Sequence, residues 1–276
     1  MPITSTPLYY RLDPVTRRIH YIEHGPELPQ SGTPRDLLIL HGNGANALLY
    51  EPMIRHLGKH FRVIAPDLPG YGRSPAKHHQ IEPYVKEMET FIQNTVSPGA
   101  ICIGHSLGGL LTYLLYQQKN LRFDKMVLME PALFPKIPRW ASLMLPGYSA
   151  YVQYSPHSRE RTRNAVRVIA LNYDDSTSFI RERFIESYIQ ADRAIQAMFF
   201  RSYPRYLPLD FSHYHMPVLC IRGEKDSYIS VVTDQVTPLI PNARKHVIPN
   251  AGHFLIGENE AGLFAAIDTF LLPETV

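Results

Sequence analysis

Ser106 lies in a sequence pattern that could make its hydroxyl a nucleophile. A short apolar run at 100–103 leads into G-H-S-L-G at 104–108, and a long apolar segment follows. This order predicts a strand, a sharp turn and a helix, the setting of a G-x-S-x-G nucleophile elbow. Gly104 and Gly108 flank the serine because a side chain at either position would collide with the neighbouring strand or helix. The positive end of the helix then faces the same space as the hydroxyl.

A serine hydroxyl is a poor nucleophile at neutral pH, so it needs a base nearby and a third group that orients the base. Asp226 and His253 both follow apolar, strand-like runs. Parallel strands gather functional loops at their carboxyl edge, so we expect both side chains near Ser106. Glu130 also follows such a run and is the alternative for the carboxylate. Asp226 is favoured because the order Ser, Asp, His is a known order of a catalytic triad.

Strands and helices alternate along the parts of the chain that carry these residues. Strand patterns cover 8–12, 18–23, 36–40, 61–65, 100–103, 125–129, 218–221 and 245–248, and helical patterns cover 47–57, 81–96, 110–118, 231–239 and 261–271. The first two strands form an edge hairpin, and the later runs are continuously apolar, as in strands buried on both faces. The chain is therefore expected to fold as an α/β protein with a mostly parallel, doubly wound sheet.

The alternation stops between residues 131 and 215, where loops punctuated by prolines, including Pro146, separate helical patterns. Helices are expected over 158–171, from Ser178, and over 191–202. We interpret 131–215 as an inserted helical cap, and 1–130 with 216–276 as the core domain. The apolar run at 137–145 is either a static part of this cap or a mobile lid.

The side chains of the expected cap suggest two further alternatives. Its aromatic residues either line a substrate pocket or pack the cap onto the core; they include Trp140, Tyr148, Tyr151, Phe199 and Phe200. The segment carries 11 Lys and Arg against 7 Asp and Glu, a balance of +4. We interpret this excess as a solvated basic surface, the alternative being attraction of anionic substrates or a membrane surface.

The composition excludes several classes of protein. The chain has 276 residues and a net charge of +3, which is too small to indicate nucleic-acid binding. The two cysteines, Cys102 and Cys220, lie in apolar runs and are expected to be buried, reduced thiols. The histidine pairs at 78–79 and at 213 and 215 have no carboxylate at ligand spacing, so no metal is expected. No signal peptide or transmembrane segment is expected, and the predicted location is cytoplasmic.

Five segments together resemble the α/β-hydrolase fold family, in its capped, lipase- and esterase-like form. They are H-G-N-G at 41–44, D-L-P-G-Y-G-R-S at 67–74, G-H-S-L-G-G at 104–109, G-E-K-D at 223–226 and G-H-F at 252–254. The resemblance implies a catalytic triad of Ser106 as nucleophile, His253 as general base and Asp226 as the carboxylate that orients it. It also implies an oxyanion hole formed by the backbone N–H groups of Leu107 and Asn43.

The resemblance implies a serine hydrolase that cleaves small-molecule carboxylic esters through an acyl-enzyme, without cofactor or metal. Lipids, thioesters and the carbon–carbon bond of a vinylogous diketone are alternative substrates for the same triad. Some capped relatives are slow-turnover small-molecule receptors, and the rate of turnover would distinguish a receptor from an enzyme. Ser106 argues against haloalkane dehalogenases and epoxide hydrolases, because these relatives place an aspartate at that position.

Overall fold

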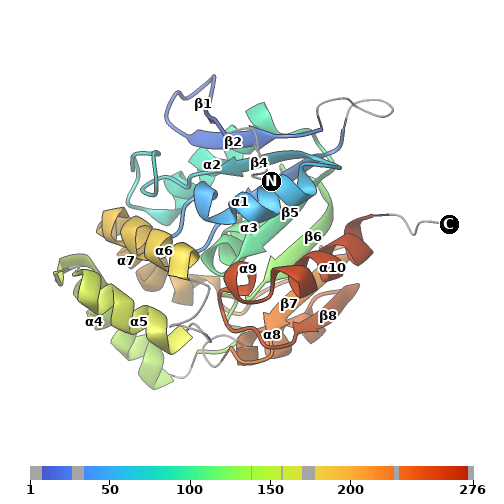
Figure 1. The fold of residues 1–276 in the computed structure, drawn as a ribbon. Helices are drawn as coiled ribbons and strands as arrows, with labels where there is room; N and C mark the ends of the chain where they lie inside the picture. The colour runs from blue at the N-terminus through green and yellow to red at the C-terminus, as the bar shows by residue number, and fades with distance from the viewer. Residues whose placement is uncertain are drawn as a thin grey trace.

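Eight strands form one mixed sheet through the centre of the molecule (Figure 1). The computed structural model describes residues 8–26, 34–137, 139–156, 158–169, 178–226 and 230–272. The strands are β1 (Tyr10–Leu12), β2 (His20–His24), β3 (Asp36–Leu40), β4 (Arg62–Pro66), β5 (Ala100–His105), β6 (Phe123–Met129), β7 (Val218–Gly223) and β8 (Ala243–Ile248). Their order across the sheet is β1-β2-β4-β3-β5-β6-β7-β8.

The pairing of the strands confirms the predicted sheet. β2 runs antiparallel to both β1 and β4, and every pair from β4 to β8 is parallel. All residues of β3 and β5 are buried, which explains the continuous apolar runs at 37–40 and 100–103. The chain passes from β3 outward to β4 and then returns to β5 on the other side. The carboxyl ends of β3 and β5 therefore flank a topological switch point, where ligands bind in open α/β sheets.

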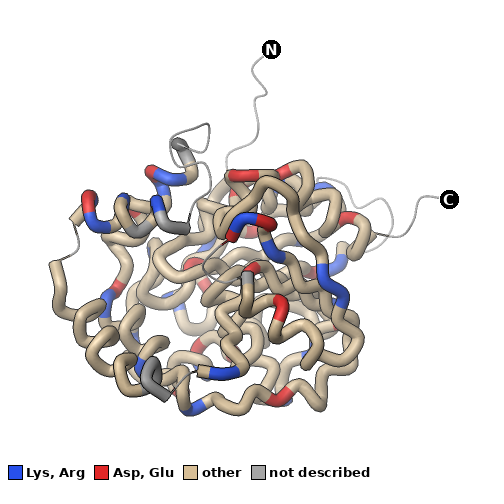
Figure 2. The backbone as a smooth tube through the Cα atoms, turned by 90° about the horizontal axis from the view of Figure 1, so that it is seen from below, with Lys and Arg blue, Asp and Glu red and all other residues tan. Residues whose placement is uncertain are grey.

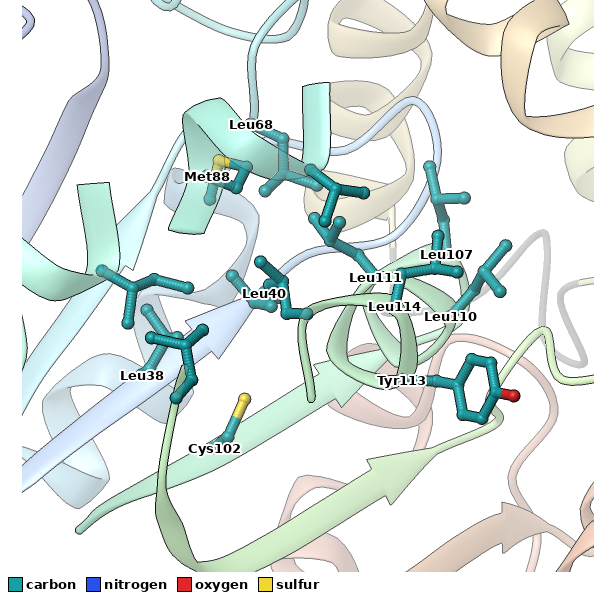
Figure 3. Packing of buried hydrophobic residues seen from close by; sticks show 14 of the residues in the cluster. Leu38, Leu40, Leu68, Met88, Cys102, Leu107, Leu110, Leu111, Tyr113 and Leu114 are labelled. Carbon is teal, nitrogen blue, oxygen red and sulfur yellow. The ribbon is translucent and has the colours of Figure 1, made fainter. Parts of the chain in front are cut away.

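Helices cover both faces of the sheet, and the strand residues alternate between them. These helices are α1 (Glu51–Leu57), α2 (Ile81–Thr95), α3 (Leu107–Gln117), α8 (Ser230–Val236), α9 (Leu255–Glu258) and α10 (Glu260–Leu271). Short 3-10 turns lie at Ala47–Tyr50 and Thr237–Leu239, and a third at Tyr203–Tyr206 belongs to the connection between β6 and β7. Leu38, Leu40 and Cys102 pack on the face that carries α2 and α3 (Figure 3). Leu37 and Ile39 pack with α1 and α10 on the opposite face.

Both cysteines lie in this core as free thiols. Cys102 and Cys220 are buried, as predicted, and burial raises the pKa of the Cys102 thiol to about 12 and that of Cys220 to about 11. A buried thiol of such high pKa is an inert packing group.

Four helices fill the connection between β6 and β7, and they gather on one side of the molecule in Figure 1. They are α4 (Arg139–Tyr154), α5 (Arg159–Ile169), α6 (Ser178–Gln190) and α7 (Arg193–Ser202). The last three correspond to the helices predicted from sequence, although the expected end of the first of these at Leu171 lies outside the described residues. We propose that these four helices, within 131–215, form the cap.

Helix α4 corrects one expectation. Pro146 lies inside this helix and does not mark a loop. Proline costs a helix one backbone hydrogen bond, and tertiary packing can offset that loss. α4 packs along α7, where the Ser149 hydroxyl donates to the Ala197 carbonyl at 2.9 Å. α7 is distant from α4 in the sequence, so the proline at 146 by itself wrongly indicated a loop.

Several charges of the cap lie next to charges of opposite sign. Arg159 pairs with Glu182 at 2.9 Å and with Glu186, and Arg183 reaches Glu51 of α1 at 3.3 Å. Figure 2 shows Lys and Arg next to Asp and Glu along the chain trace. This arrangement favours the interpretation as a solvated surface. Among the described residues, none of the helices has the length and apolar character needed to cross a bilayer.

Candidate active site

Ser106 occupies the sharp turn between β5 and α3. Its backbone has φ 52° and ψ −113°, a conformation that costs a non-glycine residue about 1–3 kcal/mol. Hydrogen bonds hold it there: its N–H donates to the Met129 carbonyl at 2.9 Å, and its carbonyl accepts from Gly109 N–H at 3.0 Å and Ala132 N–H at 2.9 Å. The predicted sharp turn is therefore present, and these hydrogen bonds from β6, α3 and the loop after β6 hold its strained backbone.

The two glycines flanking Ser106 are required by close backbone contacts. A Cβ atom on Gly108 would lie 2.0 Å from the carbonyl oxygen of Leu40 in β3. A Cβ atom on Gly104 would lie 2.6 Å from the Gly108 carbonyl oxygen and 2.5 Å from Thr112 Oγ1. Both predicted collisions are confirmed, one with a neighbouring strand and the other with the following helix.

Asp226 and His253 are brought together by the loops after β7 and β8. His253 Nδ1 lies 2.9 Å from Asp226 Oδ2, and the two residues are only 3% and 6% exposed, Asp226 being the less exposed. A carboxylate can only accept, so Nδ1 carries the proton of a neutral ring and Nε2 is the basic nitrogen. Ser106 and His253 both line one cavity.

Glu130, the alternative carboxylate, lies behind this pair. It is fully buried, and its Oε1 accepts the Gly223 N–H while its Oε2 accepts from the Thr233 hydroxyl at 3.4 Å. Burial, and secondarily the charge of Asp226, raises the pKa of Glu130 to about 9. Its carboxyl is therefore a neutral acid at pH 7, and it shares a hydrogen bond with the Asp226 side chain.

A second buried network connects the loop after β3 to the loop after β8. Gly42 N–H donates to the Tyr50 hydroxyl at 3.2 Å, and this hydroxyl lies 2.6 Å from His105 Nδ1. His105 Nε2 lies 3.1 Å from the His253 carbonyl, which can only accept, so Nε2 carries the proton and Nδ1 accepts from Tyr50. Burial, with a smaller effect of His253, lowers the pKa of His105 to about 3, so its ring stays neutral.

Sequence reasoning missed Tyr50, because nothing in its local pattern distinguishes it from other residues at a helix start. His105 is visible in the sequence only as a neighbour of Ser106. In the fold, the two side chains together tie Gly42 to the backbone of His253.

The backbone N–H groups of Asn43 and Leu107 both belong to residues that line the cavity. Asn43 follows β3, and Leu107 is the first residue of α3. Within the described part of the chain neither N–H donates a hydrogen bond. The Asn43 side chain is fixed by the Tyr71 hydroxyl, which donates to its Oδ1 at 2.9 Å. Two unpaired donors beside Ser106 can stabilise an oxygen anion there.

The cavity has a volume of about 710 Å³ and is lined by both the core and the cap helices. Its wall is mostly aliphatic and aromatic. The aromatic residues of the cap differ in position. Tyr148, Phe199 and Phe200 line the cavity, whereas the side chain of Tyr151 is 57% exposed. The side chain of Trp140 lies outside the described residues.

One group of the described side chains has donor atoms at metal-ligand spacing. Atoms of Glu130, Asp226 and His253 lie within 4.8 Å of one another. Metal ligands must give up their protons, and Glu130 holds its proton while accepting from Gly223 and Thr233. These three side chains are therefore better explained as a chain of hydrogen bonds from Glu130 through Asp226 to His253 than as the ligands of a metal ion.

Comparison with known proteins agrees with this architecture. A family model described as alpha/beta hydrolase fold matches residues 37–260. The pimeloyl-[acyl-carrier protein] methyl ester esterase of Pectobacterium atrosepticum is 36% identical over 92 residues, 33% of this chain and 35% of that protein. The chain thus matches about a third of the length of this curated relative.

Two similarities extend over nearly the whole chain. Human epoxide hydrolase 4 is 22% identical over 99% of this chain and 81% of its own. The structure of a thermophilic esterase from Thermogutta terrifontis superposes with a TM-score of 0.77 at 20% identity, covering 96% of this chain and 98% of the other. The structural likeness establishes a shared fold.

Proposed function

Since the chain belongs to the α/β-hydrolase fold family, we propose that it is a serine hydrolase that cleaves carboxylic esters through an acyl-enzyme. One observation carries this proposal. Ser106, held at positive φ on the cavity wall, shares the cavity with His253, whose Nδ1 is bonded to Asp226. These are the three groups that nucleophilic catalysis by serine requires, in the chain order of the family.

In the proposed reaction, His253 Nε2 accepts the proton of the Ser106 hydroxyl as the oxygen attacks the ester carbonyl. Asp226 holds the ring with Nδ1 protonated and stabilises the imidazolium that forms. The imidazolium then protonates the departing alcohol, and the acyl group remains on Ser106. A water molecule, activated by the same ring, releases the acid and restores the serine.

The tetrahedral intermediate carries a negative oxygen, which the proposal places between the Asn43 and Leu107 N–H groups. Removing one such donor typically costs about 2.7–4 kcal/mol of transition-state stabilisation. The Tyr50–His105 network would support this arrangement, because it fixes Gly42, the residue before Asn43.

Asp226 is the proposed orienting carboxylate, and Glu130 is not. Asp226 makes the 2.9 Å contact with His253, whereas Glu130 is engaged by Gly223 and Thr233. A neutral acid also provides less stabilisation of an imidazolium than a carboxylate. We therefore assign Glu130 a positioning role: its protonated carboxyl hydrogen-bonds Asp226 and holds it in place.

The names of the two relatives specify different substrate groups, a methyl ester for one and an epoxide for the other. Ester cleavage is favoured here because position 106 holds a serine, which forms an acyl-enzyme with a carbonyl substrate. The epoxide hydrolases of this fold use an aspartate at that position. The apolar cavity favours esters with hydrophobic acyl or alkoxy groups.

The test is multiple-turnover hydrolysis of p-nitrophenyl butyrate by the wild type and by Ser106→Ala. Ser97→Ala is the matched control, because Ser97 is exposed at the turn before β5. Steady turnover by the wild type and control, with background rates for Ser106→Ala, is the expected result. Release of one equivalent followed by a stall would favour a receptor. Full activity of Ser106→Ala would refute the assignment.

A further inference from the structure

Helix α6 packs on two loops of the candidate active site. Phe184 and Tyr188 are one helical turn apart, so both side chains project from the same face of α6. The Phe184 ring packs edge-on against Phe254, the residue after His253, with 4.9 Å between ring centroids. The Tyr188 ring lies on Gly44, in the loop after β3. One face of α6 therefore contacts both the loop of the proposed base and the loop of a proposed oxyanion donor.

The contact between Tyr188 and Gly44 is very close. A Cβ atom on Gly44 would lie 2.0 Å from Tyr188 Cδ2 and 2.9 Å from Tyr188 Cγ. Cγ is bonded to the first carbon of the side chain, so a rotation of the ring about χ2 would not move it away. Gly44 has φ 73° and directly follows Asn43, in a turn where the Ala45 N–H donates to the Gly42 carbonyl at 3.1 Å. The ring thus restricts the position of this turn next to Asn43.

The corner between α6 and α7 also reaches Asn43, through the side chain of that residue. The Asp192 N–H donates to the Gly70 carbonyl at 2.7 Å, and a Cβ atom on Gly70 would lie 2.7 Å from Ile195 Cγ1. Tyr71, the residue after Gly70, donates its hydroxyl to Asn43 Oδ1 at 2.9 Å. Contacts from α6 and α7 therefore converge on Asn43, one through its side chain and one through the residue that follows it.

Tyr188 also lines the cavity, so its ring could act in either of two ways. As a wall, it would change the binding of every occupant to a similar extent. As a support of the turn, it would matter most for a species with a negative oxygen, because stabilisation of an oxyanion requires donors held at about 2.7–3.1 Å. The ring atoms, rather than the hydroxyl, are the atoms nearest to Gly44.

We propose that Tyr188 is a positioning residue, whose ring rests on Gly44 and holds the Asn43 N–H in place for the oxyanion. The oxyanion hole is then complete only while α6 is packed on the loop after β3. The inference rests on the proposed ester hydrolysis and adds a residue of the β6–β7 connection to its machinery. Because the ring carries this role, phenylalanine at position 188 should preserve it.

The experiment compares two inhibitors of the same size. In a trifluoromethyl ketone with a pentyl chain, the Ser106 oxygen adds to the carbonyl carbon, the serine proton passes to His253, and the carbonyl oxygen becomes an anion in the proposed oxyanion hole. The corresponding trifluoromethyl alcohol occupies the cavity without forming this adduct. The ratio of the two inhibition constants, ketone over alcohol, therefore reports stabilisation of the oxyanion separately from binding in the cavity.

The ratio is measured for the wild type, Tyr188→Ala and Tyr188→Phe, together with kcat for p-nitrophenyl butyrate. Phe200→Ala is the matched control, because Phe200 also lines the cavity and its ring packs on Tyr148 of α4, with 5.0 Å between centroids. Tyr188→Ala should raise the ratio and lower kcat about tenfold or more, since a small misplacement can cost about 10²-fold. Tyr188→Phe and Phe200→Ala should keep the ratio within about threefold of the wild type.

Gly44→Ala gives an independent test of the same contact. In the wild type its methyl group would enter the space of the Tyr188 ring, and kcat should fall about tenfold or more. In Tyr188→Ala the ring is absent, so the same substitution should cost at least about fivefold less. The backbone strain of alanine at positive φ is common to both backgrounds and cancels. An equal cost in both backgrounds would show that ring and turn are not coupled, and would overturn the inference.

The failure of the inference and the failure of the proposed function can be told apart. If the wild type does not hydrolyse p-nitrophenyl butyrate, the proposed function fails, and this inference fails with it. If the wild type hydrolyses the ester but Tyr188→Ala leaves the ratio of inhibition constants unchanged, the inference alone is overturned, and Tyr188 is only a part of the wall. Tyr188→Leu replaces Tyr188→Ala if the latter does not fold, with the same expected rise in the ratio.

Discussion

Replacing Glu130 with glutamine should flatten the dependence of the protein's stability on pH. The glutamine amide has nearly the shape of the protonated acid, and its N–H can donate to Asp226 as the acid does. Its carbonyl can accept the Gly223 N–H that Glu130 accepts now. The substitution therefore keeps the hydrogen bonds to Asp226 and Gly223, reverses the 3.4 Å bond to Thr233, whose hydroxyl would accept from the amide, and removes the titration.

The magnitude follows from the pKa of Glu130, which rises from its ordinary value of 4.5 to about 9 in the folded protein. Between these values the folded carboxyl keeps a proton that the unfolded one has lost. Stability therefore falls as pH rises through this window, by about 1.4 kcal/mol per pH unit. From about pH 5.5 to 7.5, the wild type should lose about 2.7 kcal/mol from this group alone.

The assay is urea unfolding at several pH values within this window, for the wild type and Glu130→Gln. Glu82→Gln is the matched control, since the Glu82 side chain is 69% exposed. The difference in free energy of unfolding between the wild type and Glu130→Gln should grow with pH, whereas the control should parallel the wild type. Parallel profiles for all three proteins would mean that Glu130 is ionised in the fold, and the reasoning would be wrong. Ester hydrolysis by Glu130→Gln should remain within a few-fold of the wild type.

Three further substitutions test the network, the elbow and the orienting carboxylate. Tyr50→Phe removes the hydroxyl that donates a hydrogen bond to His105 Nδ1. It should lower the free energy of unfolding in urea by about 1–3 kcal/mol and should also lower kcat. An unchanged free energy of unfolding together with an unchanged kcat would contradict the role of this network. Gly108→Ala places a methyl group 2.0 Å from the Leu40 carbonyl oxygen, and should cost about 1–3 kcal/mol of stability and most of the activity; a neutral effect in both assays would show that α3 can move away. Asp226→Asn keeps the geometry but removes the charge, and should lower kcat for p-nitrophenyl butyrate by about 10⁴-fold, as in other triads; near wild-type turnover would assign the orienting role to another group.

The fold could be predicted from the sequence because its signals are local. β3 contains four consecutive apolar residues after Asp36, and its predicted limits at 36–40 match the structure. The elbow was predictable for a similar reason, since Gly104 and Gly108 mark positions where a backbone passes too close for a side chain. The limits of the expected core and cap, and the catalytic roles of the site residues, remain proposals.

The features that the sequence concealed depend on contacts between distant segments. α4 continues through Pro146 because it packs on α7. Glu130 keeps its proton because folding buries it beside Asp226, nearly a hundred positions along the chain. Periodicity and spacing do not report burial of this kind.

The central claim is that Ser106 forms a covalent acyl-enzyme. The most direct test is to quench the wild type in acid during steady hydrolysis of p-nitrophenyl butyrate, and to locate any adduct by mass spectrometry. One butyryl group on the peptide containing Ser106, absent from Ser106→Ala, is the predicted result. A butyryl group on another residue, or steady turnover with no adduct at all, would contradict it.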